Sequence, residues 1–159
     1  LWYRRQRQMC IRDRNRSEDI KQELRKLKLI VTERSSGHKP SENCDVYIVN
    51  TYGEMSKFLR LSNVTFIGGS LVNHGGQNPL EAVRMGNYVM HGKKVNNFKE
   101  IYKELKSLKI SSEIKNIDQM EKVFVKNHNY KISNSKLNKI NYLGAKIFEN
   151  NVKEIKNYL

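Results

Sequence analysis

An apolar segment, a glycine-rich loop and the start of a helix follow one another in residues 66–81, which read Phe-Ile-Gly-Gly-Ser-Leu-Val-Asn-His-Gly-Gly-Gln-Asn-Pro-Leu-Glu. Glycine lets a backbone approach a ligand closely, and the free amide groups at a helix start attract an anion such as a phosphate. This order is typical of the place where an α/β protein holds a nucleotide. The segment contains neither Gly-x-x-x-x-Gly-Lys nor Gly-x-Gly-x-x-Gly, so it is not one of the two common phosphate-binding motifs.

Short apolar runs alternate with helical patterns along the rest of the chain. Strands are predicted at residues 29–32, 45–50, 64–67 and 88–90, with a candidate fifth strand at 114–117, and helices at 17–27, 53–61, 78–85, 97–108 and from 118 onward. Alternating strands and helices favour an α/β fold with a parallel sheet covered on both faces. The length of 159 residues suits one domain with one core.

Four of the predicted helices open with a cap residue followed three positions later by glutamate. The pairs are Thr51/Glu54, Asn78/Glu81, Asn97/Glu100 and Asp118/Glu121. This spacing resembles the capping box, in which two side chains satisfy amide groups that have no partner in the first turn. Each cap contributes ~1 kcal/mol. For every one of these residues, capping is the structural alternative to a role in ligand binding.

The formal net charge is +14, which first suggests nucleic acid as a partner. No recognition motif or platform of aromatic and basic residues accompanies this charge, and the lysines are scattered through the C-terminal half. Two other interpretations stay open. The lysines would only form solvent-exposed faces of helices. Alternatively, they would attract the chain to an anionic membrane surface, where each nearby Lys or Arg contributes ~1 kcal/mol.

The chain shows no targeting or membrane-spanning segment in its sequence. No apolar run approaches the ~20 residues that cross a bilayer, and no apolar segment of a signal peptide follows the arginine-rich N-terminus. The two cysteines, Cys10 and Cys44, form no metal or redox motif. A reducing, cytoplasmic setting is therefore expected.

Residues 1–14 carry five arginines and one aspartate without a helical or strand period. They resemble the translated read-through of a sequencing adaptor. We expect them to be a non-native or disordered leader outside the fold, and the alternative is a disordered basic arm. The domain is expected to comprise residues 15–159.

Polar residues gather in three segments that would lie beyond the carboxyl ends of the strands, where open α/β sheets bind ligands. These segments are residues 50–54, 68–81 and 91–98. Gly75 and Gly76 would bring the backbone against a phosphate. Asn78 would be the first residue of the following helix, whose N-terminus would point at that phosphate. Glu81 is better suited to accept hydrogen bonds from ribose hydroxyls, with closure of the capping box as the alternative.

Ser70 and His74 each have two interpretations in the same loop. Ser70 would donate to a phosphate or begin a turn, and His74 would donate to an anion or pack against the glycines. No two histidines have the spacing of metal ligands, so no metal site is expected. Gly-x-Ser-x-Gly is absent and Cys44 has no obvious partner, so no nucleophilic catalyst is predicted.

Residues 66–81 resemble the signature of the 3-deoxy-D-manno-octulosonic acid (Kdo) transferases. Two flanking segments agree in order and spacing. Residues 50–55, Asn-Thr-Tyr-Gly-Glu-Met, resemble the family's Asp-Thr-Met/Tyr-Gly-Glu-Leu, and residues 91–98, His-Gly-Lys-Lys-Val-Asn-Asn-Phe, resemble its Gly-Pro-His-x-x-Asn-Phe. Asn50, Lys93 and Lys94 depart from that pattern. The likeness is strongest over residues 46–102.

The resemblance implies the Rossmann-like C-terminal domain of a GT-B glycosyltransferase, the half that binds the donor CMP-Kdo without a metal or other cofactor. By motif match, the donor-binding residues would be Thr51, Gly53, Glu54, Gly69, Ser70, His74, Gly75, Gly76, Asn78, Glu81 and Asn97. Such a lipid IVA Kdo transferase acts on the lipid A precursor at the cytoplasmic face of the bacterial inner membrane. That anionic surface is therefore an expected partner, and nucleic acid is not.

The resemblance also places the family's catalytic carboxylate and membrane-anchoring segment in an N-terminal acceptor domain that is missing from these 159 residues. No catalytic residue is assigned, and the chain is expected to bind the donor weakly and to catalyse nothing. Two rivals stay open. One is another GT-B transferase that uses a UDP-sugar, and the other is a basic nucleic-acid-binding module in which the glycine loop is only structural.

Overall fold

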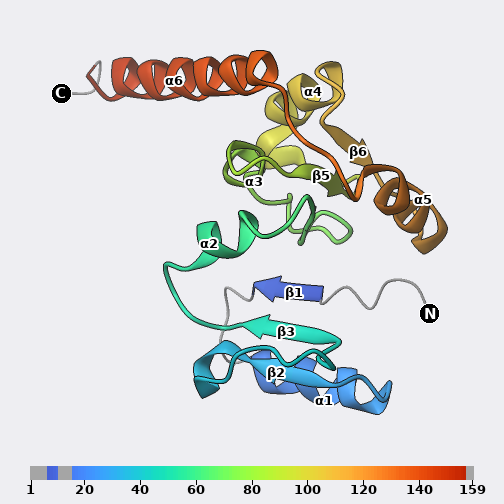
Figure 1. Ribbon diagram of the computed structural model, residues 1–159. Coiled ribbons are helices and arrows are strands. Elements are labelled where there is room, and N and C mark those ends of the chain that lie inside the picture. The colour runs from blue at the N-terminus through green and yellow to red at the C-terminus, as the bar shows by residue number, and fades with distance from the viewer. Residues whose placement is uncertain (1–6, 11–15, 157–159) are drawn as a thin grey trace. The chain divides into compact units, whose positions relative to one another are not determined.

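The computed structural model describes residues 7–10 and 16–156, and these residues form helices and parallel strands (Figure 1). The chain divides into two compact units, Leu1–Phe58 and Leu59–Leu159. Each unit has its own three-stranded parallel sheet. The sequence predicts one core for the whole chain, whereas buried apolar residues form two separate clusters.

The first unit is built on the sheet β1-β3-β2, whose strands are Arg7–Cys10, Val46–Val49 and Val31–Glu33. All four residues of the central strand β3 are buried, the pattern typical of a parallel sheet that is covered on both faces. Helix α1 (Ser17–Lys26) contacts β2, and its Lys21 bonds Glu33 at 2.7 Å. The short helices η2 (Arg34–Ser36) and α2 (Met55–Leu59) follow β2 and β3.

Strand β1 lies inside the segment that the sequence places outside the fold. Arg7–Cys10 pairs in parallel with β3, with Arg7 opposite Val46 and Cys10 opposite Val49. The structure thus gives these four residues a strand, while the expectation that residues 1–14 are a non-native or disordered leader stays a prediction. A β ladder is held by backbone amides and carbonyls, so a segment without an apolar period can still pair along it. The rest of residues 1–14 lies outside the described residues.

The second unit contains the sheet β4-β5-β6, formed by Val64–Ile67, Tyr88–His91 and Ser111–Glu113. Four helices of this unit are α3 (Leu80–Arg84), α4 (Lys99–Ser107), α5 (Ile117–Asn127) and α6 (Asn134–Lys156), and a 3-10 turn, η3 (Asn96–Phe98), precedes α4. The long helix α6 packs against α3 and extends beyond it (Figure 1). Val83, Val89, Leu105, Ile110 and Ile140 are completely buried in the core of this unit.

Several boundaries differ from those that the sequence predicts. Strand β6 lies at Ser111–Glu113, before the predicted 114–117, and residues 128–133 break the helix expected from 118 onward. The break lets Tyr130 and Ile132 pack against the core. Helix α5 is capped by Asn116, whose side chain accepts from the Gln119 amide at 2.9 Å, so the predicted Asp118/Glu121 cap is wrong.

No helix among the described residues is both long and apolar enough to cross a membrane. Within the same residues, no group of three His, Cys, Asp or Glu side chains is arranged to hold a metal ion.

Candidate functional site

The predicted site residues fall into two groups, one in each unit. Thr51, Gly53 and Glu54 follow β3 in the first unit. The other residues lie after β4 and β5 in the second unit, namely Gly69, Ser70, His74, Gly75, Gly76, Asn78, Glu81 and Asn97. Each group is at the carboxyl end of a parallel strand, as predicted.

Ser70 joins the loops that follow β4 and β5. It is completely buried, and its hydroxyl donates to the carbonyl of Ile67 at 2.6 Å. The same hydroxyl accepts from the amide of Gly92 at 2.8 Å, and the Ser70 carbonyl accepts from the amide of Lys94 at 2.7 Å. Because its hydrogen is already donated within the loop, Ser70 supports the loop in this structure and is not turned toward a ligand.

Gly92 is a site residue that the sequence analysis does not single out. A Cβ atom at this position would collide with the backbone carbonyl of Ser70. The two loops therefore approach as closely as they do only because residue 92 is glycine. Its position directly after β5 is the signal that would have identified it.

Gly75 and Gly76 both adopt left-handed backbone conformations, with φ values of 76° and 73°. A Cβ on Gly75 would lie 2.5 Å from Nδ2 of Asn97, and one on Gly76 would lie 3.1 Å from the carbonyl oxygen of Lys94. The Asn97 amide also donates to the Gly75 carbonyl at 3.3 Å. The structure thus brings Gly75, Gly76 and Asn97 together, as expected for residues of one site.

The helix that follows the glycine loop begins later than predicted. Helix α3 starts at Leu80, and the side chain of Asn78 accepts from the Leu80 amide at 3.0 Å. Asn78 therefore closes the turn before the helix. Glu81 is exposed on the first turn of α3, and no hydrogen bond of its side chain is among those of the described residues. The N-cap of α3 is Pro79 and has no side-chain cap, so the predicted Asn78/Glu81 capping box is wrong.

The remaining loop residues differ in exposure. His74 is exposed, and its amide donates to the Val72 carbonyl at 2.8 Å. Gly69 has a left-handed φ of 72° and approaches the Cβ of His74. At the other end of the loop, the Tyr102 hydroxyl donates to the Gln77 carbonyl at 2.9 Å. Tyr102, which lies on α4, thereby fixes the end of the loop just before α3.

Tyr102 also packs against His91, the last residue of β5. The centroids of their two rings lie 4.3 Å apart. Burial lowers the pKa of His91 below its ordinary value, although the neighbouring Gly92 carbonyl acts in the opposite direction. Burial raises the pKa of the Tyr102 hydroxyl. Both shifts favour the neutral form of the side chain, and the two packed rings support the loops.

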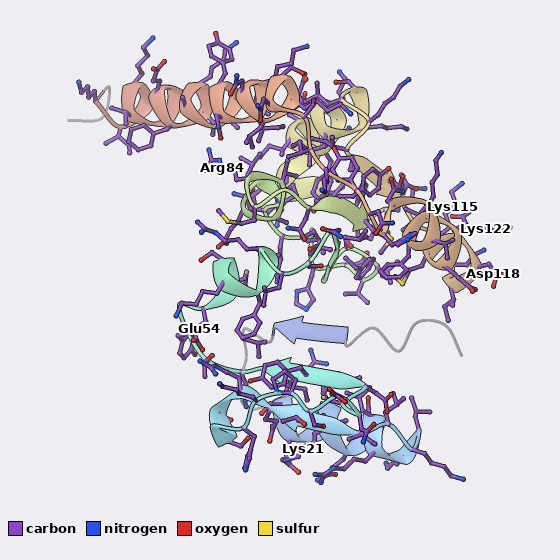
Figure 2. All side chains as sticks on the ribbon, in the orientation of Figure 1. Lys21, Glu54, Arg84, Lys115, Asp118 and Lys122 are labelled. Atoms are coloured by element: carbon purple, nitrogen blue, oxygen red, sulfur yellow. The ribbon has the colours of Figure 1, made fainter. Side chains whose placement is uncertain are left out.

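In the first unit, Glu54 lies just before α2, where Figure 2 labels it. It is the centre of a hydrogen-bonded cluster. Its Oε2 accepts from Thr51 Oγ1 at 2.6 Å and from Arg34 Nε at 3.0 Å, and its Oε1 accepts from Arg34 Nη2 at 3.0 Å. Lys57 Nζ lies 3.5 Å from the same Oε1. The Thr51/Glu54 pair thus meets through its side chains, while Gly53 between them is exposed with a φ of 76°.

The hydrogen bonds of Arg34 lower the pKa of Glu54 to about 2, and the Thr51 hydroxyl contributes in the same direction. The Glu54 carboxylate raises the pKa of the Arg34 guanidinium in turn. Both groups are therefore charged over the whole physiological range.

Arg34 is a second residue beside the predicted site that the sequence analysis does not single out. It follows β2 directly, so the rule that points to the carboxyl ends of strands applies to it. The predicted strand at 29–32 ends one residue earlier than β2, which runs over Val31–Glu33.

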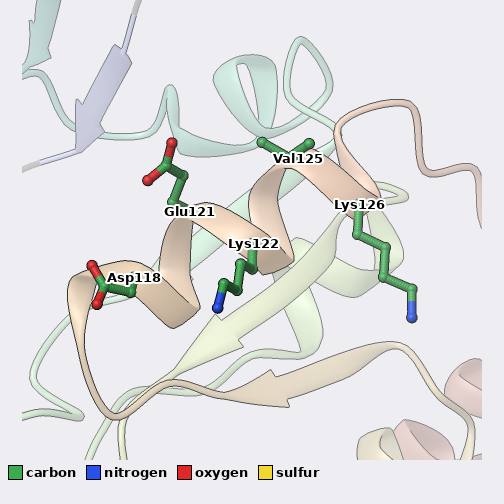
Figure 3. A pocket seen from close by; sticks show the side chains of 5 residues that line it. All are labelled: Asp118, Glu121, Lys122, Val125 and Lys126. Atoms are coloured by element: carbon green, nitrogen blue, oxygen red, sulfur yellow. The ribbon is translucent and has the colours of Figure 1, made fainter.

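Two depressions in the surface lie beside α5, away from the residues predicted for the site. The larger, about 600 Å³, is lined by Asp118, Glu121, Lys122, Val125 and Lys126 of this helix (Figure 3). The smaller, about 380 Å³, is bordered by the edge strand β6 and by lysines that include Lys106 and Lys115. No predicted site residue lines either of them.

Curated relatives match this chain over part of their length. A 3-deoxy-D-manno-octulosonic acid transferase of Haemophilus influenzae is 40% identical over 82 residues, 52% of this chain and 19% of that protein. The enzyme of the same name from Rickettsia bellii is 31% identical over 130 residues, 82% of this chain and 26% of that protein. A bifunctional glycosyltransferase/methyltransferase of Fusobacterium nucleatum is 32% identical over 94 residues, 59% of this chain and 15% of that protein.

The chain therefore spans about a fifth to a quarter of the length of the two transferases. No family model matches the chain.

A solved structure agrees with the sequence relatives. The crystal structure of the C-terminal CMP-Kdo binding domain of WaaA from Acinetobacter baumannii superposes with a TM-score of 0.68 and 27% identity. The match covers 72% of this chain and 60% of that domain. By sequence and by fold, the chain is thus a partial match to the Kdo transferases, as its motifs predict.

Proposed function

We propose that this chain is the donor-binding half of a Kdo transferase and that it binds CMP-Kdo. The observation that carries this proposal is the fold that it shares, at 27% identity, with the C-terminal CMP-Kdo binding domain of WaaA. The arrangement of the glycine loop supports it, because Gly75, Gly76 and Asn97 meet beyond the carboxyl ends of the strands.

The proposed phosphate contact is made by the backbone of residues 75–78. Gly75 and Gly76 are partly buried and Asn78 is exposed, so this stretch borders solvent. Left-handed glycines allow successive amide groups to converge on an anion. Ser70 would hold this loop in place, and Asn97 would form its rim. His74 and Glu81 are exposed and would contact the sugar and ribose portions of the donor.

In the first unit, Thr51, Gly53 and Glu54 follow β3, and by motif match they would contact the donor. Asn50, which departs from the family's motif, is buried, and its Oδ1 accepts from the Ser35 amide at 3.0 Å. An aspartate would offer the same acceptor, so this departure preserves the local structure.

The acceptor is proposed to be the lipid A precursor, lipid IVA, bound by an N-terminal half that also supplies the catalytic carboxylate. On this proposal the present chain binds the donor without a metal and does not transfer the sugar by itself. Its action would take place at the cytoplasmic face of the bacterial inner membrane, where the net charge of +14 favours the anionic lipid surface.

Isothermal titration of the 159-residue chain with CMP, UMP and UDP tests the donor class. We expect CMP to bind more tightly than either uridine nucleotide. Tighter binding of UDP would instead favour another GT-B transferase that uses a UDP-sugar.

A transfer assay with CMP-Kdo and lipid IVA tests the second part of the proposal. We expect no product from the chain alone, and turnover would contradict the assignment of the catalytic group to another domain. Retention on RNA that falls steeply with salt, together with no binding of CMP, would favour the nucleic-acid alternative.

A further inference from the structure

We propose that Arg34 is a positioning residue of the donor site, which fixes the Glu54 carboxylate and through it the Thr51 hydroxyl. The inference deepens the proposed function and rests on it, because Thr51 and Glu54 belong to the site only if the chain binds the nucleotide sugar. Arg34 belongs to none of the motifs that carry the resemblance to Kdo transferases. It lies 20 residues before Glu54 in the sequence.

The contact between Arg34 and Glu54 is bidentate. Nε and Nη2 of the guanidinium each lie 3.0 Å from a different carboxylate oxygen. Two parallel hydrogen bonds of this kind fix the orientation of both groups as well as their separation. Lysine supplies a point charge and would not reproduce this geometry. The side chain of Glu54 is largely shielded, with 17% of its surface exposed, so the pair is less open to competition from water than a surface ion pair.

Arg34 is itself held in place by the turn that carries it. The Ser35 amide donates to the buried Asn50 side chain at 3.0 Å, which joins η2 to the end of β3. On the other side, Gly37 ends the turn with a φ of 74°, and its amide donates to the Arg34 carbonyl at 3.1 Å. The backbone that carries the Arg34 side chain is therefore anchored to the end of β3, where Thr51 also lies.

The cluster determines what Thr51 can offer to a ligand. Its hydroxyl hydrogen is donated to Glu54 at 2.6 Å, so its oxygen is left as an acceptor. A threonine in this state recognises a hydroxyl or amino group of the nucleotide and not a phosphate. Ribose hydroxyls and the amino group of cytosine both have this chemistry, whereas the carbonyl that uracil carries in place of that amino group does not.

The test measures CMP affinity by isothermal titration for the full chain and three variants, Arg34→Gln, Arg34→Lys and Arg25→Gln. Arg25 is an exposed arginine of α1 in the same unit, so Arg25→Gln controls for the loss of one positive charge. We expect Arg34→Gln to weaken CMP binding about tenfold, as the loss of charged hydrogen bonds predicts. Arg34→Lys should restore only part of the affinity, and Arg25→Gln should bind like the unchanged chain.

A second readout separates positioning from folding. The carboxyl carbon of Glu54, followed by NMR as pH is lowered, should titrate near 2 in the unchanged chain and closer to the ordinary 4.5 in Arg34→Gln. The groups that face this carboxylate are Arg34, Lys57 and the Thr51 hydroxyl. Arg34→Lys keeps the charge and provides the comparison if Arg34→Gln has a lower melting temperature.

Two nucleotides distinguish the possible partners of Thr51. Weaker binding of 2′-deoxy-CMP would identify a ribose hydroxyl, and weaker binding of UMP would identify the cytosine amino group. If the unchanged chain binds CMP and Arg34→Gln binds it equally well, the inference about Arg34 is wrong while the proposed function stands. If the unchanged chain does not bind CMP, the proposed function fails, and with it the assignment of Arg34 to a donor site.

Discussion

The Ser70 hydroxyl accepts a hydrogen bond from the Gly92 amide at 2.8 Å, in a contact that is completely buried. This bond ties the loop after β4 to the loop after β5. The two residues are 22 positions apart, and their meeting follows from the parallel pairing of the two strands.

Replacing Ser70 by alanine should destabilise the second unit by about 1–3 kcal/mol, because the Gly92 amide would lose its partner in a buried place. The free energy of unfolding from urea denaturation measures this loss. Ser107→Ala is the matched control, since that hydroxyl is exposed and donates only to the Glu104 carbonyl of its own helix. Equal stability of the two variants would show that the bond does not hold the loops together.

Replacing Gly92 by alanine should be more damaging than Ser70→Ala. The added methyl group would collide with the Ser70 backbone, which cannot move aside as the end of a flexible side chain can. We expect a lower melting temperature and a marked loss of folded protein. Gly68→Ala is the control, because a Cβ there meets nothing within 4 Å. A Gly92→Ala chain as stable as Gly68→Ala would contradict the close approach of the loops.

Replacing Gly75 by alanine should weaken CMP binding about tenfold or more, since a left-handed φ of 76° and the contact with Asn97 both disfavour a side chain. Isothermal titration measures the change, with Ser107→Ala in helix α4 as the control outside the loop. The same substitution should leave retention on RNA unchanged if the chain is a nucleic-acid-binding module. Unchanged CMP affinity would argue against a role of this loop in donor binding.

Acid should destabilise the first unit through Glu54. Its pKa is lowered from 4.5 to about 2 in the folded chain, so its contribution to stability is complete above pH 4.5 and is lost as pH falls toward 2. The difference in melting temperature between the unchanged chain and Glu54→Gln should therefore shrink over this interval and stay constant at higher pH. A difference that does not vary between pH 5 and pH 2 would contradict the ion pair with Arg34.

The sequence was most informative where apolar runs and glycines coincide. Strand β4 has the predicted bounds, 64–67, and the loop after it brings Gly75 and Asn97 together as expected. The first result follows from a local pattern, since a short run rich in apolar and β-branched residues predicts a strand. The second follows from the parallel sheet, which brings the loops after neighbouring strands to one edge.

The missed features depend on contacts between distant residues. Arg34 and Glu54 are 20 residues apart, and no period in the sequence indicates their pairing. The break at residues 128–133 places Tyr130 and Ile132 against the core. The segment consists mostly of weak helix formers, but the helical apolar stripe on either side of it hides the break in the sequence. The division into two units likewise depends on which apolar residues meet.

Arg7–Cys10 pairs in parallel with the middle strand of the first sheet. Strands pair through backbone amides and carbonyls, so a proline at a residue whose amide faces β3 would remove a donor and should make the amides of β3 exchange faster.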